Sequence, residues 1–132
     1  MTSLLDRLAS ILGEILSVEV ESDGALTVRH NGTFASLRVV RIVEDLDLMS
    51  LTQVLVWDLP LTKKVRDQVA REAREVNFGS LTLLEKGTRD AKTGDVMLRY
   101  NFPGAGLTDD ALRTLILLVL DTGARIRGEL TT

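Results

Sequence analysis

Hydrophobic residues near the start of the chain recur every three or four positions, which is the spacing of one face of an α-helix. Ser3 precedes this pattern and can accept a hydrogen bond from the free amides of the first turn. Gly13 lies inside the predicted helix and weakens it slightly. The apolar face is wide enough to need a sheet or a partner to cover it, and it consists of Leu4, Leu5, Leu8, Ile11, Leu12, Ile15 and Leu16.

A second helix is predicted in the middle of the chain, where the hydrophobic stripe is narrower. Thr62 can cap its start, and Asn77-Phe78-Gly79 ends it, because glycine tolerates the left-handed conformation that follows a last turn. Basic and acidic residues are interleaved along this segment, which favours a salt-bridged face exposed to solvent. The stripe itself consists of Val65, Val69, Ala73 and Val76.

The third predicted helix follows Thr108, a suitable capping residue, and has Asp109 and Asp110 in its first turn, where they complement the helix dipole. Leu117 and Leu118 extend its apolar character beyond the main stripe. This helix therefore offers more apolar surface than one sheet face needs. The main stripe consists of Leu112, Leu115, Ile116, Val119, Leu120 and Ile126.

Several shorter segments are rich in β-branched residues or alternate between apolar and polar residues, as strands do. Asn31-Gly32 is a two-residue hairpin signal, since both residues accept a positive φ angle. The acidic segment Glu44–Leu48 and the polar segment Lys86–Gly94 are predicted connections. The predicted strands are Val18–Glu21, Leu26–His30, Phe34–Val43, Leu51–Trp57, Ser80–Glu85 and Asp95–Phe102.

Together these elements predict an α+β fold in which three helices accompany an antiparallel β-sheet. The predicted order is α-β-β-β(-β)-α-β-β-α, with the fourth strand optional. The length of 132 residues fits a single domain, residues 1–132. A chain of this length buries roughly two thirds of its unfolded surface, so it needs neither a disulfide nor a metal in order to fold.

The composition argues against several kinds of chemistry. The chain has no cysteine, which excludes disulfides, thiolate metal sites and cysteine nucleophiles. One histidine, His30, is a thin basis for a metal cluster or for acid–base catalysis. The Gly104-Ala105-Gly106 segment lacks the Lys-Ser/Thr of a phosphate loop and is treated as a connection. We therefore expect no enzymatic activity, no cofactor and no metal site.

Charge and hydropathy bear on partners and location. The net charge of −3 and the pI near 5.2 provide no general attraction to nucleic acid or to an anionic membrane. Glu44, Asp45 and Asp47 lack the ligand spacing of a calcium loop, which favours a solvated turn. There is no basic start followed by an apolar run, and the longest apolar run is far shorter than the roughly 20 residues of a membrane span. We expect a cytoplasmic protein.

Three segments carry a resemblance to a known family. They are Glu44–Leu51 running into Val54–Trp57, the helix end Glu75-Val76-Asn77, and the segment Pro103–Thr108 that leads into the last helix. With these segments the chain resembles the YbjN-domain family, described as bacterial sensory transduction regulators and similar in fold to the small type III secretion chaperones. The resemblance covers the chain from about Leu4 to Ile126. It implies an antiparallel sheet with helices, no catalytic centre, and binding of protein segments.

The function expected from the residues and the resemblance together is a non-enzymatic protein-binding module. It would be chaperone-like or adaptor-like, bind protein or peptide segments, and form a homodimer, as secretion chaperones of this fold commonly do. The alternative is a regulatory or sensory module that binds a small ligand or a signalling partner. An enzyme is the least favoured class, since no nucleophile is paired with a base in the sequence.

Two groups of residues are predicted to contact partners, although ordinary core packing is the competing interpretation for both. The first group would bind a client protein along the first helix and the neighbouring strand end. Its members are Leu5, Leu8, Leu12, Ile15, Val54, Val56 and Trp57. The second group would form the homodimer interface on the central helix with its neighbouring strand. Its members are Val65, Val69, Ala73 and Val76.

Overall fold

The computed structural model of the chain describes residues 3–132, and these residues form three helices and six strands. The helices are α1 (Leu4–Gly13), α2 (Lys63–Glu75) and α3 (Asp109–Leu130). The strands are β1 (Ser17–Val20), β2 (Leu26–His30), β3 (Thr33–Val43), β4 (Leu46–Pro60), β5 (Ser80–Gly87) and β6 (Lys92–Pro103). The predicted α+β class and element order are confirmed, with the optional fourth strand present.

The helices begin where their capping residues lie in the sequence. The side-chain oxygens of Ser3, Thr62 and Thr108 each accept a hydrogen bond of 3.1 Å from the backbone amide three residues later. Each bond satisfies one of the amides that a first helical turn leaves free. All three predicted caps are confirmed.

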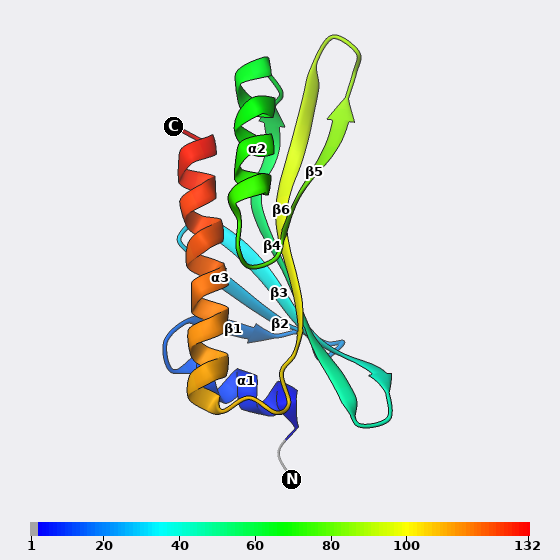
Figure 1. Cartoon of the computed structure of the whole chain (residues 1–132), viewed down its shortest axis with the longest axis vertical. Coiled ribbons are helices and arrows are strands. Elements are labelled where there is room, and N and C mark those ends of the chain that lie inside the picture. Colours follow the sequence, from blue (N-terminus) through cyan, green and yellow to red (C-terminus); the bar gives the residue numbers. More distant parts are fainter. Residues whose placement is uncertain (1–2) are drawn as a thin grey trace.

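The strands form one antiparallel sheet in the order β1-β2-β3-β4-β6-β5. Figure 1 shows α2 and α3 on one side of this sheet, with α1 below them at the end where β1 lies. Two hairpins project from its ends, β3–β4 near the bottom of the view and β5–β6 at the top. None of the helices of residues 3–132 is long and apolar enough to cross a membrane.

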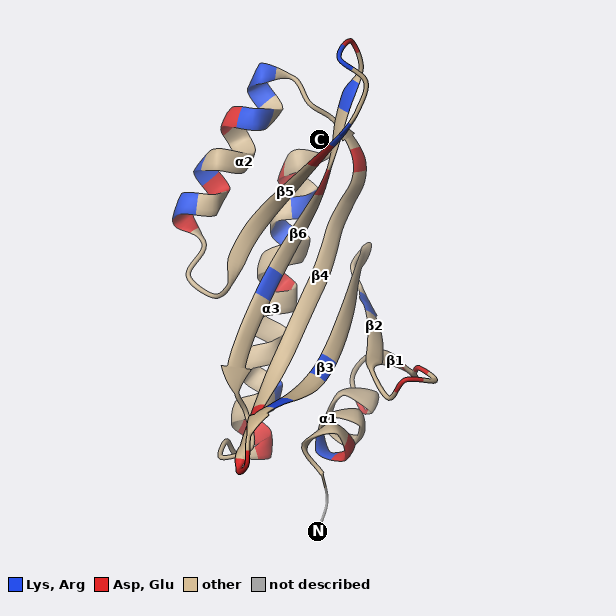
Figure 2. Ribbon diagram, turned by 90° about the vertical axis from the view of Figure 1, so that its right-hand side faces the viewer, with Lys and Arg blue, Asp and Glu red and all other residues tan. Residues whose placement is uncertain are grey.

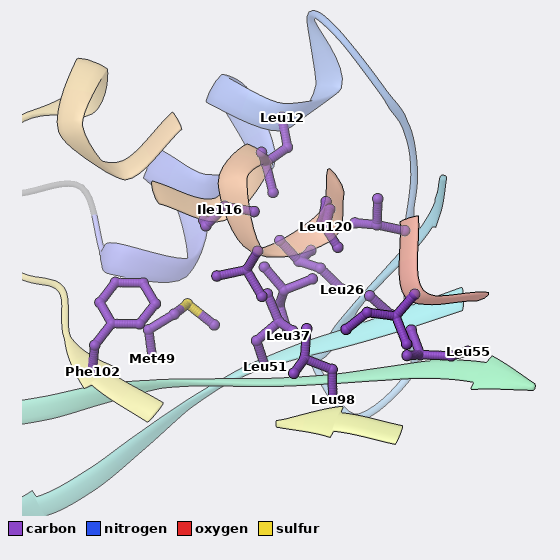
Figure 3. Packing of buried hydrophobic residues seen from close by; sticks show 14 of the residues in the cluster. Leu12, Leu26, Leu37, Met49, Leu51, Leu55, Leu98, Phe102, Ile116 and Leu120 are labelled. Atoms are coloured by element: carbon purple, nitrogen blue, oxygen red, sulfur yellow. The ribbon is translucent and has the colours of Figure 1, made fainter. Parts of the chain in front are cut away.

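The core lies between the helices and one face of the sheet. Figure 3 shows side chains of α1 and α3 meeting those of the strands, with Leu12, Ile116 and Leu120 above Leu51 and Leu98. Burial of these aliphatic side chains is the main favourable contribution to folding, about 1.5–3 kcal/mol for each fully buried leucine or isoleucine. The fully buried large side chains are Leu8, Leu12, Leu26, Leu37, Met49, Leu51, Leu55, Leu98, Leu112, Ile116, Leu120 and Ile126.

Two predicted connections are longer than the turns that the structure shows in their place. The acidic segment Glu44–Leu48 is mostly strand, because the β3–β4 hairpin turns tightly at Asp45 and β4 begins at Leu46. The polar segment Lys86–Gly94 is likewise a hairpin in which Gly87 pairs with Lys92. Polar residues are compatible with strand structure at both places, because the hairpins project into solvent beyond the core. Asp47, for example, accepts from Arg41 across the hairpin at 3.1 Å.

Gln53 is a buried polar residue on the core face of β4. Its side-chain amide nitrogen donates to Thr33 Oγ1 at 2.8 Å and to the carbonyl of Leu120 in α3 at 3.0 Å. The amide lies directly against Gly123, where a Cβ atom would collide with it. Gly123 is therefore the residue that allows α3 to pass close to β4.

A buried carboxylate joins α2 to α3. The Glu72 side chain is only 5% exposed and lies 3.4 Å from the guanidinium of Arg125, which also binds Glu129 at 3.1 Å. Contact with the Glu129 carboxyl group, together with burial, raises the pKa of Glu72. The same contact and the Arg125 charge lower the pKa of Glu129.

Replacing Glu72 with glutamine is expected to change how stability depends on pH. The native state holds the Glu72 proton more tightly than the unfolded chain does, so this group stabilises the fold below its ordinary pKa of 4.5. That contribution is lost as the pH rises from 4.5 through the raised pKa of Glu72. Urea unfolding at a series of pH values should therefore show a smaller decline for Glu72→Gln than for the wild type over this interval.

Glu75→Gln is the matched control, because Glu75 is exposed on the same helix. Its pH profile should follow that of the wild type. Superimposable profiles of the wild type and Glu72→Gln would contradict the assigned role of Glu72.

Candidate functional site: the open face of the sheet

The side chains of the central strand alternate between two different surroundings. In β4, Met49, Leu51 and Gln53 are buried beneath the helices, whereas Ser50 and Thr52 between them are only half-buried. Strand side chains alternate between the two faces of a sheet, so the second set points away from the helices. In the part of the chain that the structure describes, no helix or strand covers this second face. Figure 2 looks onto it, with the strands in front of α3.

We call this surface the open face. The pairing of the strands places its side chains in rows that cross the sheet. Its members come from five strands, and they are Arg29 of β2, Phe34, Ser36, Arg38 and Val40 of β3, Leu48, Ser50, Thr52, Val54 and Trp57 of β4, Met97, Arg99 and Asn101 of β6, and Ser80, Thr82 and Leu84 of β5.

One row of the open face is apolar. Phe34, Val54 and Met97 are direct neighbours on β3, β4 and β6, and Thr82 continues the row on β5. Phe34 is 42% exposed, and Leu84 near the end of the row is 48% exposed. Aromatic and aliphatic side chains that adjoin across strands form a continuous surface. The open face therefore has an apolar centre in which Phe34 is exposed and Val54 is half-buried, whereas Met97 is covered by its neighbours and only 7% exposed.

Trp57 borders this row because β4 is irregular beyond Val54. The pairing with β6 shifts between Val54 and Val56 and again between Val56 and Leu59, and Asp58 has a positive φ of 54°. Such bulges redirect side chains and disrupt the ladder locally. Trp57 consequently projects from the sheet with 60% of its surface exposed.

The bulge has its own supporting contact from the helical side. The guanidinium of Arg127 in α3 donates to the backbone carbonyl of Leu55 at 2.6 Å, at the point where the ladder shifts. A charged donor compensates for a carbonyl that the irregular ladder would otherwise leave without a strong partner. Arg127 therefore helps to hold the backbone conformation from which Trp57 projects.

A small cluster of charged residues, Lys86, Asp58 and Asp95, lies beside the Trp57 ring. Lys86 Nζ lies 5.9 Å from the centre of the indole ring, 2.6 Å from Asp58 and 2.9 Å from Asp95. The Asp58 backbone amide donates to Asp95 at 3.0 Å, and this bond together with Lys86 lowers the pKa of Asp95. The two carboxylates raise the pKa of Lys86. The ammonium of Lys86 is thus engaged by both carboxylates and is not a free positive charge, and the cluster lies against the tryptophan ring.

Two arginines of this surface are not neutralised in this way. Arg99 on β6 has only uncharged direct neighbours, Thr52 on one side and Ser80 on the other. Arg29 of β2 stands over the ring of Phe34, with its guanidinium carbon 5.6 Å from the ring centre. Among residues 3–132, neither arginine lies within ion-pair distance of a carboxylate.

The structure separates the residues that were predicted to bind a client. Val54 and Trp57 lie at the open face, whereas Val56 is buried on the helical side of the bulge. Leu8 and Leu12 are completely buried in the core, so neither can contact a partner while the chain is folded.

The other two predicted client residues also lie on α1 or directly after it. Leu5 is half-buried and lines a hollow of about 210 Å³ beside β3. Ile15 follows the end of α1 and is 46% exposed. The structure therefore does not join the α1 residues and the β4 residues into one continuous groove.

The residues predicted for a homodimer interface are mostly engaged within the chain. Val69 is buried, and Val65 and Val76 are half-buried against the core. Ala73 is exposed. The α2 stripe therefore serves mainly to attach this helix to its own sheet.

Five residues of this site are not identified from the sequence, and they are Arg29, Phe34, Leu84, Met97 and Arg99. A signal for Met97 and Arg99 is present in the sequence, because the alternation in Asp95–Phe102 places both on the face opposite Val96 and Leu98. Periodicity separates the two faces of a strand but does not say which face the helices cover.

Within residues 3–132, no group of three or more histidine, aspartate or glutamate side chains is arranged to hold a metal ion. His30 is bound to Asp121 of α3, with 2.7 Å between its Nε2 atom and the carboxylate. This contact ties the β2–β3 hairpin to the helix. The loop before α3 is similarly tied, since Arg7 donates to the carbonyl of Leu107 at 2.6 Å.

The fold and the open face define an α+β protein whose antiparallel sheet is covered by helices on one side. No family model and no curated protein matches the sequence. One solved structure does match, that of YbjN from E. coli, which is described as a candidate transcription regulator. The match covers 99% of this chain and 93% of the YbjN chain, with a TM-score of 0.60 and 13% sequence identity. At this identity the likeness concerns the fold, and the expected YbjN-like fold is confirmed.

Proposed function

We propose that the chain is a non-enzymatic protein-binding module, chaperone-like or adaptor-like, that binds protein or peptide segments and acts as a homodimer. The observation that supports this function best is the apolar centre of the open face, with Phe34 and Trp57 both exposed on it. A contiguous exposed apolar surface with polar residues around it is typical of a protein interaction site. Tryptophan is also among the residues that contribute most to binding energy at such sites.

The geometry supports a site that is already formed before a partner arrives. Trp57 is held by the β4 bulge, by Arg127 behind the bulge and by Lys86 beside the ring. An anchor that is ordered beforehand loses less conformational entropy on binding. A module of this kind requires no chemical step, in agreement with the expectation of no catalytic centre.

Self-association has support from a second surface. The outer side of α3 carries a shallow hollow of about 450 Å³, lined mainly by apolar residues that include Leu107, Leu115 and Leu118. Leu118 is 46% exposed. Because Val69 of α2 is buried within the chain, α3 is the better supported surface for a homodimer contact. An isologous contact would pair this patch with its copy.

The alternative of a small-ligand module has weaker support. Ligand pockets are concave and contain a few polar groups that converge on the ligand. A hollow of about 500 Å³ on α2 is lined by charged residues of one exposed helix face, and its Lys63 is already bound to Asp67 at 2.9 Å. Two of its polar groups are therefore directed at each other rather than at a ligand.

The test compares capture by the wild type with capture by a variant of the open face. The immobilised wild type should retain specific proteins from a lysate of the source cells, and Phe34→Ser/Trp57→Ala should lose them while keeping its thermal midpoint within a few degrees. Ile15→Ser is the matched control, because Ile15 is an exposed apolar residue away from the open face. Light scattering should give the mass of two chains. Equal capture by wild type and double variant would contradict this assignment.

A further inference from the structure

We infer that the open face binds an amphipathic helix that carries acidic residues, from a partner protein. This inference rests on the proposed function and specifies its partner. The two features that carry it are the apolar row Phe34–Val54–Met97 and the unpaired arginines Arg99 and Arg29.

The backbone of the sheet favours a helix over an extended segment as the occupant. Each of the inner strands β3, β4 and β6 has a hydrogen-bonded strand on both sides within the sheet. Their backbone amides and carbonyls are therefore already paired and are not available to a segment that lies on the open face. An extended segment lying on this face would therefore leave its own backbone groups without partners on the sheet side. A helix satisfies its backbone internally and presents only side chains. A helix also covers a sheet face in the usual layered architecture.

The unpaired arginines of the open face determine which charge the partner must carry. Arg99 stands among uncharged residues on the open face, and covering it with an apolar or basic surface would bury a positive charge without compensation. A carboxylate on the partner would pair with the guanidinium and could accept two of its hydrogen bonds. Arg29, held over Phe34, offers a second cation at the other end of the apolar row.

A second copy of the chain fits this face poorly. It would bring another pair of unpaired arginines into the interface. The carboxylates at this surface nearest to Trp57 are Asp58 and Asp95, and both are already engaged by Lys86. Like charges placed together across an interface oppose association. The same two carboxylates make the Trp57 end of the face unfavourable for acidic partner residues.

The spacing of the arginines predicts the pattern of the partner helix. Arg29 on β2 and Arg99 on β6 are three strands apart, and Arg99 lies two residues further along its strand than Met97, which is level with Arg29. At about 4.8 Å between neighbouring strands and about 3.4 Å per residue, the two positions are separated by about 16 Å. A helix rises about 1.5 Å per residue, so this separation corresponds to about eleven residues, or three turns. We expect two acidic residues at this spacing, with apolar residues between them on the same helix face to contact Phe34 and Val54.

The probe is a synthetic helix without tryptophan. It is an alanine- and glutamine-based peptide of about 18 residues, with two glutamates about eleven positions apart and leucines between them on the same face. A second peptide has lysine at both glutamate positions, and a third has a proline at its centre, which breaks the helix. Binding is measured by titration calorimetry, and the site is reported by the emission of Trp57, the single tryptophan of the chain.

The acidic peptide is expected to bind at least about tenfold more tightly than the basic one, and to shift the Trp57 emission to shorter wavelength. Arg99→Glu should reverse this preference. Arg89→Glu is the matched control, because Arg89 is exposed in the β5–β6 turn, away from the apolar row, and it should change neither affinity. The proline peptide should bind at least about tenfold more weakly than the acidic one.

Each contrary result has a distinct meaning. Equal binding of the acidic and basic peptides, with a shift in Trp57 emission, would overturn the acidic partner while leaving the proposed protein-binding function intact. If the proline peptide bound as tightly as the acidic one, the inferred partner would be an extended segment and not a helix. A dimer that Arg99→Glu dissolves would assign the face to a second copy. Absence of any peptide binding up to about 1 mM would overturn the inference, whereas the proposed function would fail only with the capture experiment.

Discussion

Replacing Leu8 with aspartate is expected to unfold the protein. Leu8 is completely buried among the core residues of α1, the sheet and α3. Removing a buried leucine side chain alone costs about 2–5 kcal/mol, and the carboxylate adds the cost of placing a charge in an apolar environment. The total stability of a domain is about 5–15 kcal/mol, so the combined loss approaches or exceeds what is available. Circular dichroism and urea unfolding would measure it.

Ile15→Asp is the matched control for this prediction. Ile15 follows the same helix but is 46% exposed, so the substitution should change the free energy of unfolding by no more than about 0.5 kcal/mol. If Leu8→Asp kept the urea midpoint of the wild type, Leu8 would not be a core residue, and the earlier interpretation of α1 as a client-binding surface would be restored.

Replacing Gly123 with valine is expected to lower the free energy of unfolding by about 2–6 kcal/mol. Overpacking of a core costs about 1–3 kcal/mol, and loss of the Gln53 hydrogen bonds leaves buried polar groups unpaired at a further cost of about 1–3 kcal/mol. Both costs arise because the new side chain would occupy the place of the Gln53 amide. Urea unfolding followed by circular dichroism would measure the loss.

Two further variants test the cause of that loss. Gly128→Ala, on the same helix, has open space around the added methyl group and should stabilise the protein by about 0.5–1 kcal/mol. Gln53→Ala combined with Gly123→Val should cost less than the two single changes added together, because the first provides space for the second. Strict additivity would mean that the two side chains do not compete for the same place.

Much of the fold was predictable because it depends on local patterns. The caps at Ser3, Thr62 and Thr108 are visible in the sequence, since a hydroxyl followed by an apolar stripe is a sufficient signal for a helix start. The Asn31-Gly32 turn is equally local, and both residues have the expected positive φ angles. The class and order of the elements followed from these signals without any knowledge of long-range contacts.

The candidate site was only partly predictable because it depends on packing between distant segments. Trp57 and Val54 were identified, but the apolar stripe of α1 could equally serve a core or a partner until the position of α3 was known. The bulge that exposes Trp57 depends on the register between β4 and β6 and on Arg127 from α3. Arg99 could not be identified from the sequence, because a single arginine in a strand has no special meaning until its neighbours are known.

The strand order also bears on how the chain folds. Within residues 3–132, four of the five strand pairings join strands that are consecutive in the sequence, whereas β4 and β6 are separated by α2 and β5. Closing a long loop costs chain entropy before the pairing is formed, and non-local contacts slow folding. The β1–β4 meander and the β5–β6 hairpin can each form locally. We expect their union along β4 and β6 to be the step that sets the folding rate, and the same seam carries the apolar row that a partner would contact.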